Sequence, residues 1–180
     1  VVEKLGTAGF AEVFRRPPVS SQQILHPEKY LQGVIPTTPG VPRFPGERDY
    51  KAIAEGSVGE LDHSILLRQY ASEEDSDKLA PRWRGGTYRI VEHKRNKQRH
   101  ILQYAVEWDA PEAAGEYLRL YKKVLAGKWK KMEVTSEGEA RLTGRGDDGF
   151  FVVQVAGAIT SVIEGLESPF EGPDARAAIK

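Results

Sequence analysis

The sequence contains no cysteine, and its 26 basic and 26 acidic residues give a formal net charge of zero. The absence of cysteine excludes disulfides, thiolate nucleophiles and cysteine-ligated zinc. The balanced charge argues against a dedicated nucleic-acid binder, because such binding depends on neutralising many phosphates. We therefore expect no nucleic-acid partner.

Long hydrophobic runs are also lacking. The longest, FFVVQVAGAITSVI from Phe150, is broken by polar and glycine residues, and it is shorter than the ~20 residues that span a bilayer. We expect no membrane span, and we interpret this run as a buried strand followed by a helix over residues 158–166. With 180 residues, 39% hydrophobic and 29% charged, the sequence is that of a soluble globular protein, long enough for one domain or for one domain with an extended arm.

The first residues, VVEKLG, include neither an initiating methionine nor the basic-then-apolar pattern of a signal peptide. We therefore expect a fragment of a longer precursor. Any function completed elsewhere in that precursor would leave no trace in this sequence.

Residues 1–47 read as a helix end, the LHPEKY segment and a proline-rich arm. Proline ends helices, so Pro17 and Pro18 should stop the first helix. Ser20 or Ser21 can cap the next one, and Pro27, which fits only a first turn, favours two short turns over a single helix. The apolar positions of the first helix are Val1, Val2, Leu5, Ala8, Phe10, Val13 and Phe14. The prolines of the extended connector are Pro36, Pro39, Pro42 and Pro45.

Residues 48–180 read as an α+β domain. Helices are predicted around residues 56–72, 73–79 and 109–127, the first with Leu61, Ile65, Leu66 and Tyr70 on one face and the last with Asp109 as its N-cap. Alternating patterns predict strands over 87–93, 99–108, 128–136, 139–145 and 149–157. Strands grouped in pairs or threes between helices favour an antiparallel sheet that is covered on one face by helices.

The segment LHPEKYL places His26, Glu28 and Tyr30 close together, but it lacks the His-Glu-x-x-His spacing of a helical zinc site. We expect these residues to make structural hydrogen bonds that hold the arm in place, and we predict no catalytic residue, metal site or cofactor in this chain. His63, on an amphipathic helix, is predicted to be an ordinary, partly exposed residue.

Trp83 and Trp108 lie in an aromatic-rich strand–strand–helix unit. Aromatic side chains at such positions either fill the core or line a ligand cleft, and we favour the core. The alternative, a small ligand or peptide held between sheet and helix near these two tryptophans, stays open.

The segment PPVSSQQILHPEKYL resembles a Pro-Pro-x-Ser-Thr-Glu-Gln-x-Leu-His-Pro-Glu-Lys-Tyr segment of a poorly characterised bacterial and archaeal group that is similar to gluzincin-type zinc metallopeptidases. Later stretches resemble that group loosely. The matching residues there are Trp83, Gly85, Tyr88, Trp108, Asp109, Ala114 and Tyr117. Ser21, Gln22, Arg82 and Gly86 depart from the group's pattern.

The resemblance implies the C-terminal part of a metallopeptidase-like protein, whose metal-binding helix would lie upstream. The partner would then be an N-terminal peptidase-like half, and the working expectation for the compartment is the cell envelope or secretion. Three hypotheses follow: a non-catalytic module that packs on the peptidase half or assists it, an independent ligand-binding or peptide-binding domain, and, in third place, a hydrolase that uses His26 and Glu28.

Overall fold

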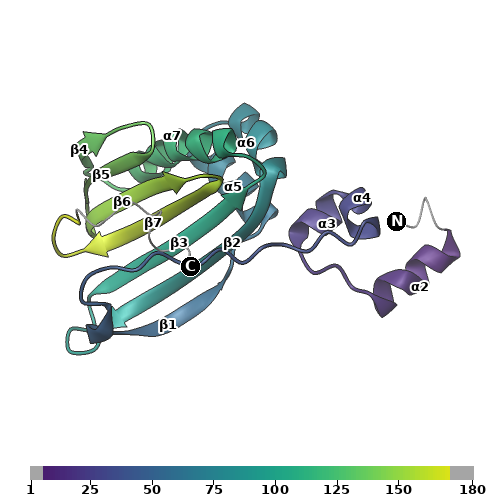
Figure 1. Ribbon diagram of the computed structural model, residues 1–180, viewed down its shortest axis with the longest axis horizontal. Helices are drawn as coiled ribbons and strands as arrows, with labels where there is room; N and C mark the ends of the chain where they lie inside the picture. Colours follow the sequence, from purple (N-terminus) through teal and green to yellow (C-terminus); the bar gives the residue numbers. More distant parts are fainter. Residues whose placement is uncertain (1–5, 171–180) are drawn as a thin grey trace.

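A seven-stranded sheet lies at the centre of the computed structural model, which describes residues 6–170 (Figure 1). Its strands are β1 (Tyr50–Ser57), β2 (Trp83–His93), β3 (His100–Trp108), β4 (Glu133–Glu137), β5 (Arg141–Gly146), β6 (Gly149–Ala156) and β7 (Ile159–Leu166). Their order across the sheet is β1-β2-β3-β7-β6-β5-β4, and all neighbouring strands are antiparallel.

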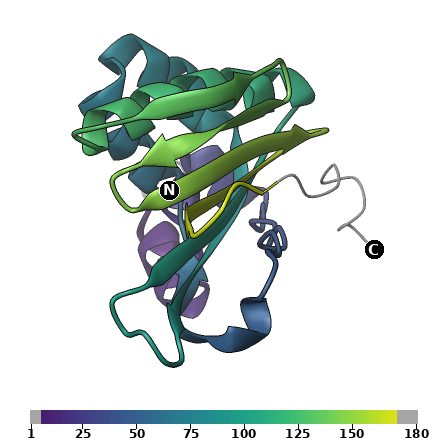
Figure 2. The same cartoon turned by 90° about the vertical axis from the view of Figure 1, so that its left-hand side faces the viewer.

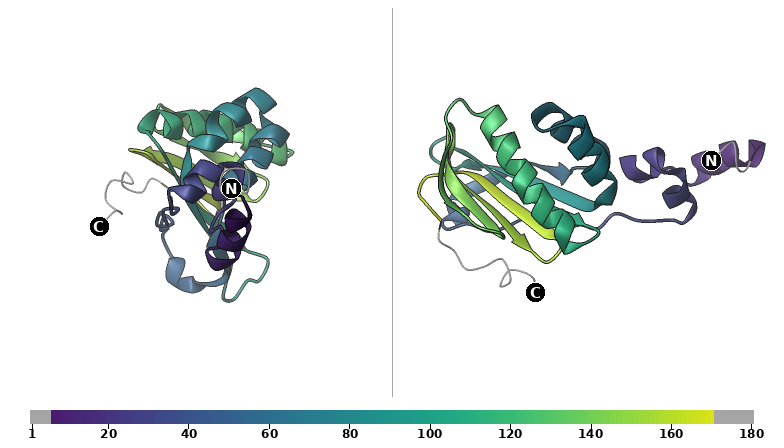
Figure 3. Two further views of the ribbon diagram at one scale, coloured as in Figure 1. Left: turned by 90° about the vertical axis from the view of Figure 1, so that its right-hand side faces the viewer. Right: turned by 90° about the horizontal axis from the view of Figure 1, so that it is seen from above.

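Three helices cover one face of this sheet, as the view from above shows (Figure 3). They are α5 (Glu60–Tyr70), α6 (Glu73–Leu79) and α7 (Pro111–Lys128); the short 3-10 helix η2 (Ala80–Arg82) leads from α6 into β2. We call the covered side the helix face and the opposite side the open face. The predicted α+β fold, with an antiparallel sheet covered on one face by helices, is confirmed. Within residues 6–170, no helix is both long and apolar enough to cross a bilayer.

The two faces of the sheet carry separate hydrophobic clusters. On the helix face, α7 packs on the sheet through Tyr117, Leu118 and Leu125, among others, together with residues of β3, β5, β6 and β7. On the open face, a smaller cluster holds Phe44 of the arm and Phe150 and Phe170 of the C-terminal half. Because the side chains of a strand point alternately to opposite faces, the neighbours Phe150 and Phe151 fall into different clusters.

The N-terminal arm begins with the helices α2 (Thr7–Arg15), α3 (Ser21–Leu25) and α4 (Pro27–Leu31), which project beyond the end of the sheet (Figure 3). Ser20 caps α3 by accepting a hydrogen bond from the backbone of Gln23, and Pro27 opens α4, so the prediction of two short elements is confirmed. Val1, Val2 and Leu5 lie outside the described residues.

The proline-rich stretch after α4 contains no helix or strand until η1 (Glu47–Asp49), as expected of an extended connector. It passes along the open face of the sheet, opposite the helices (Figure 2). There the side-chain amide of Gln103 donates to the carbonyl of Pro42 over 2.7 Å.

The helix predicted over residues 158–166 is wrong, because this segment is strand β7, which pairs with β3 and β6. Gly157, with φ of 57°, occupies the left-handed conformation that glycine readily adopts in a two-residue hairpin turn. The β-branched residues that follow, Ile159, Thr160, Val162 and Ile163, favour a strand. Strand β1 was not predicted at all.

The predicted faces and caps of two helices also need correction. In α5, Leu61 and Ile65 are exposed, whereas Glu60, His63 and Leu67 point inward. Helix α7 has Ala110, not Asp109, at its N-cap, because Asp109 instead pairs with Arg82 across the β2–β3 strand ends at 2.8 Å. The helix ends at Lys128, one residue beyond its predicted end.

Candidate functional site

The predicted site residues of the N-terminal arm meet the domain at the beginning of helix α5. His26 ends α3 and precedes α4, and its Nε2 lies 2.6 Å from a carboxylate oxygen of Glu60, the first residue of α5. An ionised carboxylate only accepts, so Nε2 carries the proton in this hydrogen bond. Glu60 is 3% exposed. The contact therefore links the arm to a buried carboxylate of the domain, while the His26 side chain itself is 26% exposed.

Glu28 and Tyr30 have different surroundings from His26. The Glu28 carboxylate is more than half exposed and lies 3.6 Å from Nδ1 of His26. Tyr30 is buried within the arm, where its hydroxyl donates to the carbonyl of Arg16 over 2.6 Å and the Arg16 guanidinium lies 4.9 Å above its ring. Tyr30 thus holds α2 against α4, while His26 holds the arm to the domain.

Further anchors come from residues that the sequence did not single out as a site. The side-chain amide of Gln22 donates to the carbonyl of Trp83 over 2.7 Å, and Lys29 donates to the carbonyl of Pro81 over 3.1 Å. The Ser21 hydroxyl accepts from the backbone of Leu61, in the first turn of α5. An ionised glutamate at position 22 would have no N–H to donate to this carbonyl.

The described residues around His26 orient its ring but place no nucleophile beside it. Within residues 6–170, the side-chain partners of His26 are two carboxylates, and no hydroxyl contacts its ring. The same part of the chain holds no group of three histidine, aspartate or glutamate residues that would suit a metal ion. A serine-type triad needs a hydroxyl hydrogen-bonded to the histidine, so this geometry favours a structural role for His26.

One turn further along α5, His63 is fully buried, so the prediction of a partly exposed residue is wrong. Its Nδ1 lies 2.7 Å from the carbonyl oxygen of Gly59, and its Nε2 contacts the Tyr104 hydroxyl. Because a carbonyl only accepts, Nδ1 carries the proton and Nε2 accepts from Tyr104. The Tyr104 hydroxyl is 3.2 Å from that of Tyr117, which donates to it. The donor in each of these three hydrogen bonds is thereby determined.

Burial shifts the pKa values of His63, Tyr104 and Tyr117 away from their usual range. Desolvation lowers the pKa of His63 to about 4, against weaker opposing effects of the Gly59 carbonyl and Asp62. Desolvation also raises the pKa of both Tyr104 and Tyr117. At neutral pH all three side chains are therefore uncharged. This is expected, because burying a charge without a counter-ion costs a large free energy.

Trp83 and Trp108 face each other across β2 and β3, at the end of the sheet next to the arm. They are 2% and 1% exposed, and Trp108 packs against Tyr117 with ring centroids 4.8 Å apart. Their indole rings fill the core between the sheet and the helices, which is the interpretation that the sequence favoured. The backbone carbonyl of Trp83 is the group that binds the arm, through Gln22.

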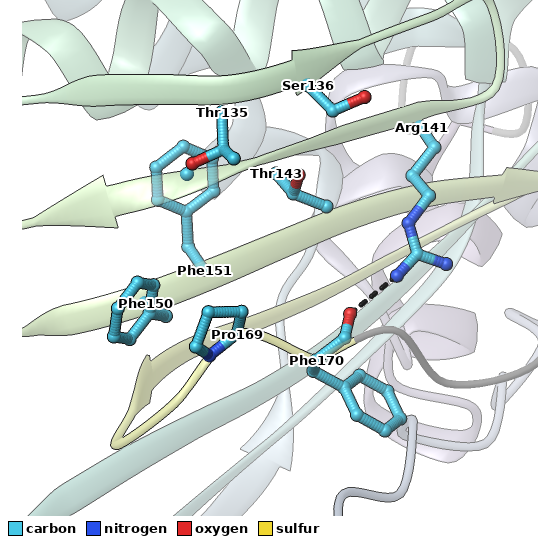
Figure 4. A pocket seen from close by; sticks show the side chains of 9 residues that line it. Thr135, Ser136, Arg141, Thr143, Phe150, Phe151, Pro169 and Phe170 are labelled. Atoms are coloured by element: carbon cyan, nitrogen blue, oxygen red, sulfur yellow. Dashed lines mark hydrogen bonds between the residues drawn. The ribbon is translucent and has the colours of Figure 1, made fainter.

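The clefts lined by Phe170 lie on the open face of the sheet, away from these tryptophans. One, of about 300 Å³, is bordered by β4, β5, β6 and the segment Pro169–Phe170 (Figure 4). Figure 4 shows the Arg141 guanidinium reaching the carbonyl oxygen of Phe170, over 2.6 Å. A second, of about 270 Å³, is lined by both Phe44 and Phe170.

The fold and these contacts define an α+β domain with a docked helical arm and a partly covered open face. Residues 47–174 match the family described as Domain of unknown function (DUF8575), and the chain belongs to that family. No curated protein and no solved structure matches the chain. The family match bears on neither a peptidase nor a ligand, so the metallopeptidase resemblance stays a prediction.

Proposed function

We propose that this chain is a non-catalytic module that packs, through its N-terminal arm, against the peptidase-like half of a larger protein. The observation that supports the proposal most is the surface of the arm. Six of the ten large apolar side chains exposed within residues 6–170 belong to this short segment. They are Phe10, Phe14, Val19, Ile24, Leu25 and Ile35.

The two phenylalanines of α2 form the centre of this surface. Their ring centroids are 5.1 Å apart in an edge-to-face arrangement, and the two side chains are 63% and 74% exposed. Adjacent exposed aromatic rings are typical of surfaces that bind another protein, because their burial yields a large apolar contribution.

The contacts of the arm hold this surface in a defined position. Tyr30 fixes α2 to α4, and His26, Gln22 and Lys29 fix the α3–α4 pair to the domain. These bonds use polar groups, so the apolar side chains of α2 and α3 stay available for a partner. A preordered surface loses less conformational entropy on binding, which favours a stable complex.

The test is complex formation between residues 1–180 and the segment that precedes Val1 in the full gene product, expressed separately and mixed. Size-exclusion chromatography with light scattering should show a 1:1 complex. Phe14→Glu should abolish it, whereas Ile53→Glu, a matched change at an exposed apolar residue of edge strand β1, should leave it intact. A gene product without an upstream peptidase-like segment, or a complex that tolerates Phe14→Glu, would contradict the proposal.

The alternative function is peptide or small-ligand binding by the domain on its own. A ligand between Trp83 and Trp108 would have to open a core in which both rings are almost fully enclosed. The clefts beside Phe170 favour the open face for such a ligand instead. Tryptophan fluorescence that responds to a ligand panel, with a response lost in Trp83→Phe, would favour the location between the tryptophans.

A further inference from the structure

Two segments far apart in the sequence cover the open face in a similar way. Phe44 lies two residues after Pro42 in the arm, and Phe170 directly follows Pro169 after β7; both rings pack on the same open-face cluster. The first segment is extended, and the second follows the end of the sheet without helix or strand. The open face thus binds proline–aromatic segments of its own chain at two places.

Both segments are held through their backbone carbonyls. The Gln103 amide, fully buried, donates to the carbonyl of Pro42 over 2.7 Å, and Arg141 donates to the carbonyl of Phe170 over 2.6 Å. Proline has no N–H to donate, so a proline-rich segment is recognised through its carbonyls and its rings. Recognition of such a segment needs side-chain donors for its carbonyls and apolar rings for its own rings. Gln103 and Arg141 are such donors, and they lie beside the aromatic cluster of the open face.

The cleft of Figure 4 continues this surface toward the edge strand β4. Beyond Phe170 it offers the ring of Phe150 together with the hydroxyls of Thr135, Ser136 and Thr143. Hydroxyls can both donate and accept, so they suit the N–H and carbonyl groups of an extended peptide. The edge strand itself is exposed along its whole length.

We infer that the open face around this cleft binds an extended peptide of a partner protein that contains a proline–aromatic pair, and that Pro169–Phe170, which forms one wall of the cleft, holds the place that this pair would take. The partner's aromatic ring takes the position of the Phe170 ring on the open-face cluster. Its carbonyl takes the hydrogen bond of Arg141, and its neighbouring backbone contacts the hydroxyls of β4 and β5. The intramolecular occupant lowers the apparent affinity, because it must leave first. This inference is independent of the peptidase-like half.

The test uses a fluorescein-labelled peptide with the sequence Gly-Leu-Glu-Ser-Pro-Phe-amide, that of residues 165–170, and a control peptide that ends in Pro-Ala. Fluorescence anisotropy measures binding to the wild-type chain and to Phe170→Ala. We expect Phe170→Ala to bind the Pro-Phe peptide about tenfold more tightly than the wild type does, because the competing ring is removed. The Pro-Ala peptide should bind neither protein.

Two further variants in the Phe170→Ala background test the role of Arg141. Arg141→Gln should weaken binding about fivefold or more, because a charge-assisted donor is lost. Arg119→Gln, a matched change at an exposed arginine on α7, should have no effect. Circular dichroism checks that each variant is folded, and Thr143→Val replaces Arg141→Gln if that variant is not.

Three results would overturn the inference: equal affinity of wild type and Phe170→Ala, equal affinity for the two peptides, or no binding by Phe170→Ala at millimolar concentration. A second copy of this chain is the competing occupant. It would appear in light scattering as a dimer of the wild type that Phe170→Ala abolishes, and it would replace the partner peptide. The arm-dependent complex described under the proposed function should be unchanged in Phe170→Ala, so the two proposals can fail separately.

Discussion

At the scale of single residues, the chemistry of the site depends on which atoms carry protons. His26 donates to a buried carboxylate, and His63 donates to a backbone carbonyl while it accepts from a tyrosine. The ring nitrogens of both histidines thus form hydrogen bonds that hold the structure together. Gln22 is likewise used as a donor, because its side-chain amide donates to the carbonyl of Trp83.

We predict that the chain loses stability as the pH falls from about 6.5 to about 4, in part because of His63. The folded-state pKa of His63 is lowered to about 4, so in this window the unfolded chain binds a proton that the folded chain does not. The stabilisation is present above pH 6.5 and is lost progressively below it, by roughly 3 kcal/mol for the full shift.

Urea unfolding of wild type and His63→Gln at several pH values measures this effect. Glutamine does not titrate, so the variant should show a flatter dependence of the free energy of unfolding on pH between 4 and 6.5. Parallel curves for the two proteins would show that other groups, such as the carboxylates, account for the whole acid dependence.

At the scale of the elements, the sequence predicted most helices and strands but not all. Where apolar residues alternate or recur at helical spacing, as in β2, β3 and α7, the prediction was correct. Strand β1 is mostly exposed on both faces at the edge of the sheet, so it has no alternation to detect. Strand β7 is nearly continuous in apolar and small residues, a pattern from which helix and strand cannot be distinguished.

The candidate site was predictable only in part, because its contacts join distant residues. The sequence drew attention to His26 and Tyr30, but the partner of His26 is Glu60, 34 residues away. The buried face of α5 was misassigned, because Leu61 and Ile65 are more hydrophobic than Glu60 and His63, which point inward. His63 bonds to Gly59 within its own helix, and one carboxylate oxygen of Glu60 bonds to His26 of the arm.

The corrected face of α5 leads to a prediction on stability. Leu67→Ala removes a fully buried side chain and should lower the free energy of unfolding by about 2–5 kcal/mol. Leu61→Ala, on the exposed face of the same helix, should change it by less than about 1 kcal/mol. Urea unfolding of the two variants measures both values, and a larger loss for Leu61→Ala would show that the assignment of the faces is wrong.

At the scale of the whole molecule, the arm and the domain are joined by contacts at the end of the sheet. Gly85 of β2 lies so close to the arm that a Cβ added there would stand 2.1 Å from the carbonyl oxygen of Thr37. The backbone of Thr37 also donates to the carbonyl of Arg84 over 2.9 Å. The lack of a side chain at Gly85 is therefore what lets the arm reach the sheet.

We predict that Gly85→Ala displaces the arm without unfolding the domain. Limited proteolysis should cut the proline-rich connector faster in this variant, because the connector can no longer lie against β2. Gly115→Ala is the matched control, since nothing lies within 4 Å of a Cβ added there and alanine favours the helix that contains it. Equal cleavage of the two variants would show that the arm is not held at this place.

The most direct test of the proposed function is backbone hydrogen exchange of residues 6–37, measured in the isolated chain and in its mixture with the proposed peptidase-like segment. If the exposed face of α2 and α3 is the docking surface, exchange in peptides that cover Phe10, Phe14 and Ile24 should slow on mixing, while exchange in the sheet stays unchanged. Unchanged exchange in the arm, or protection confined to the sheet, would contradict the proposal.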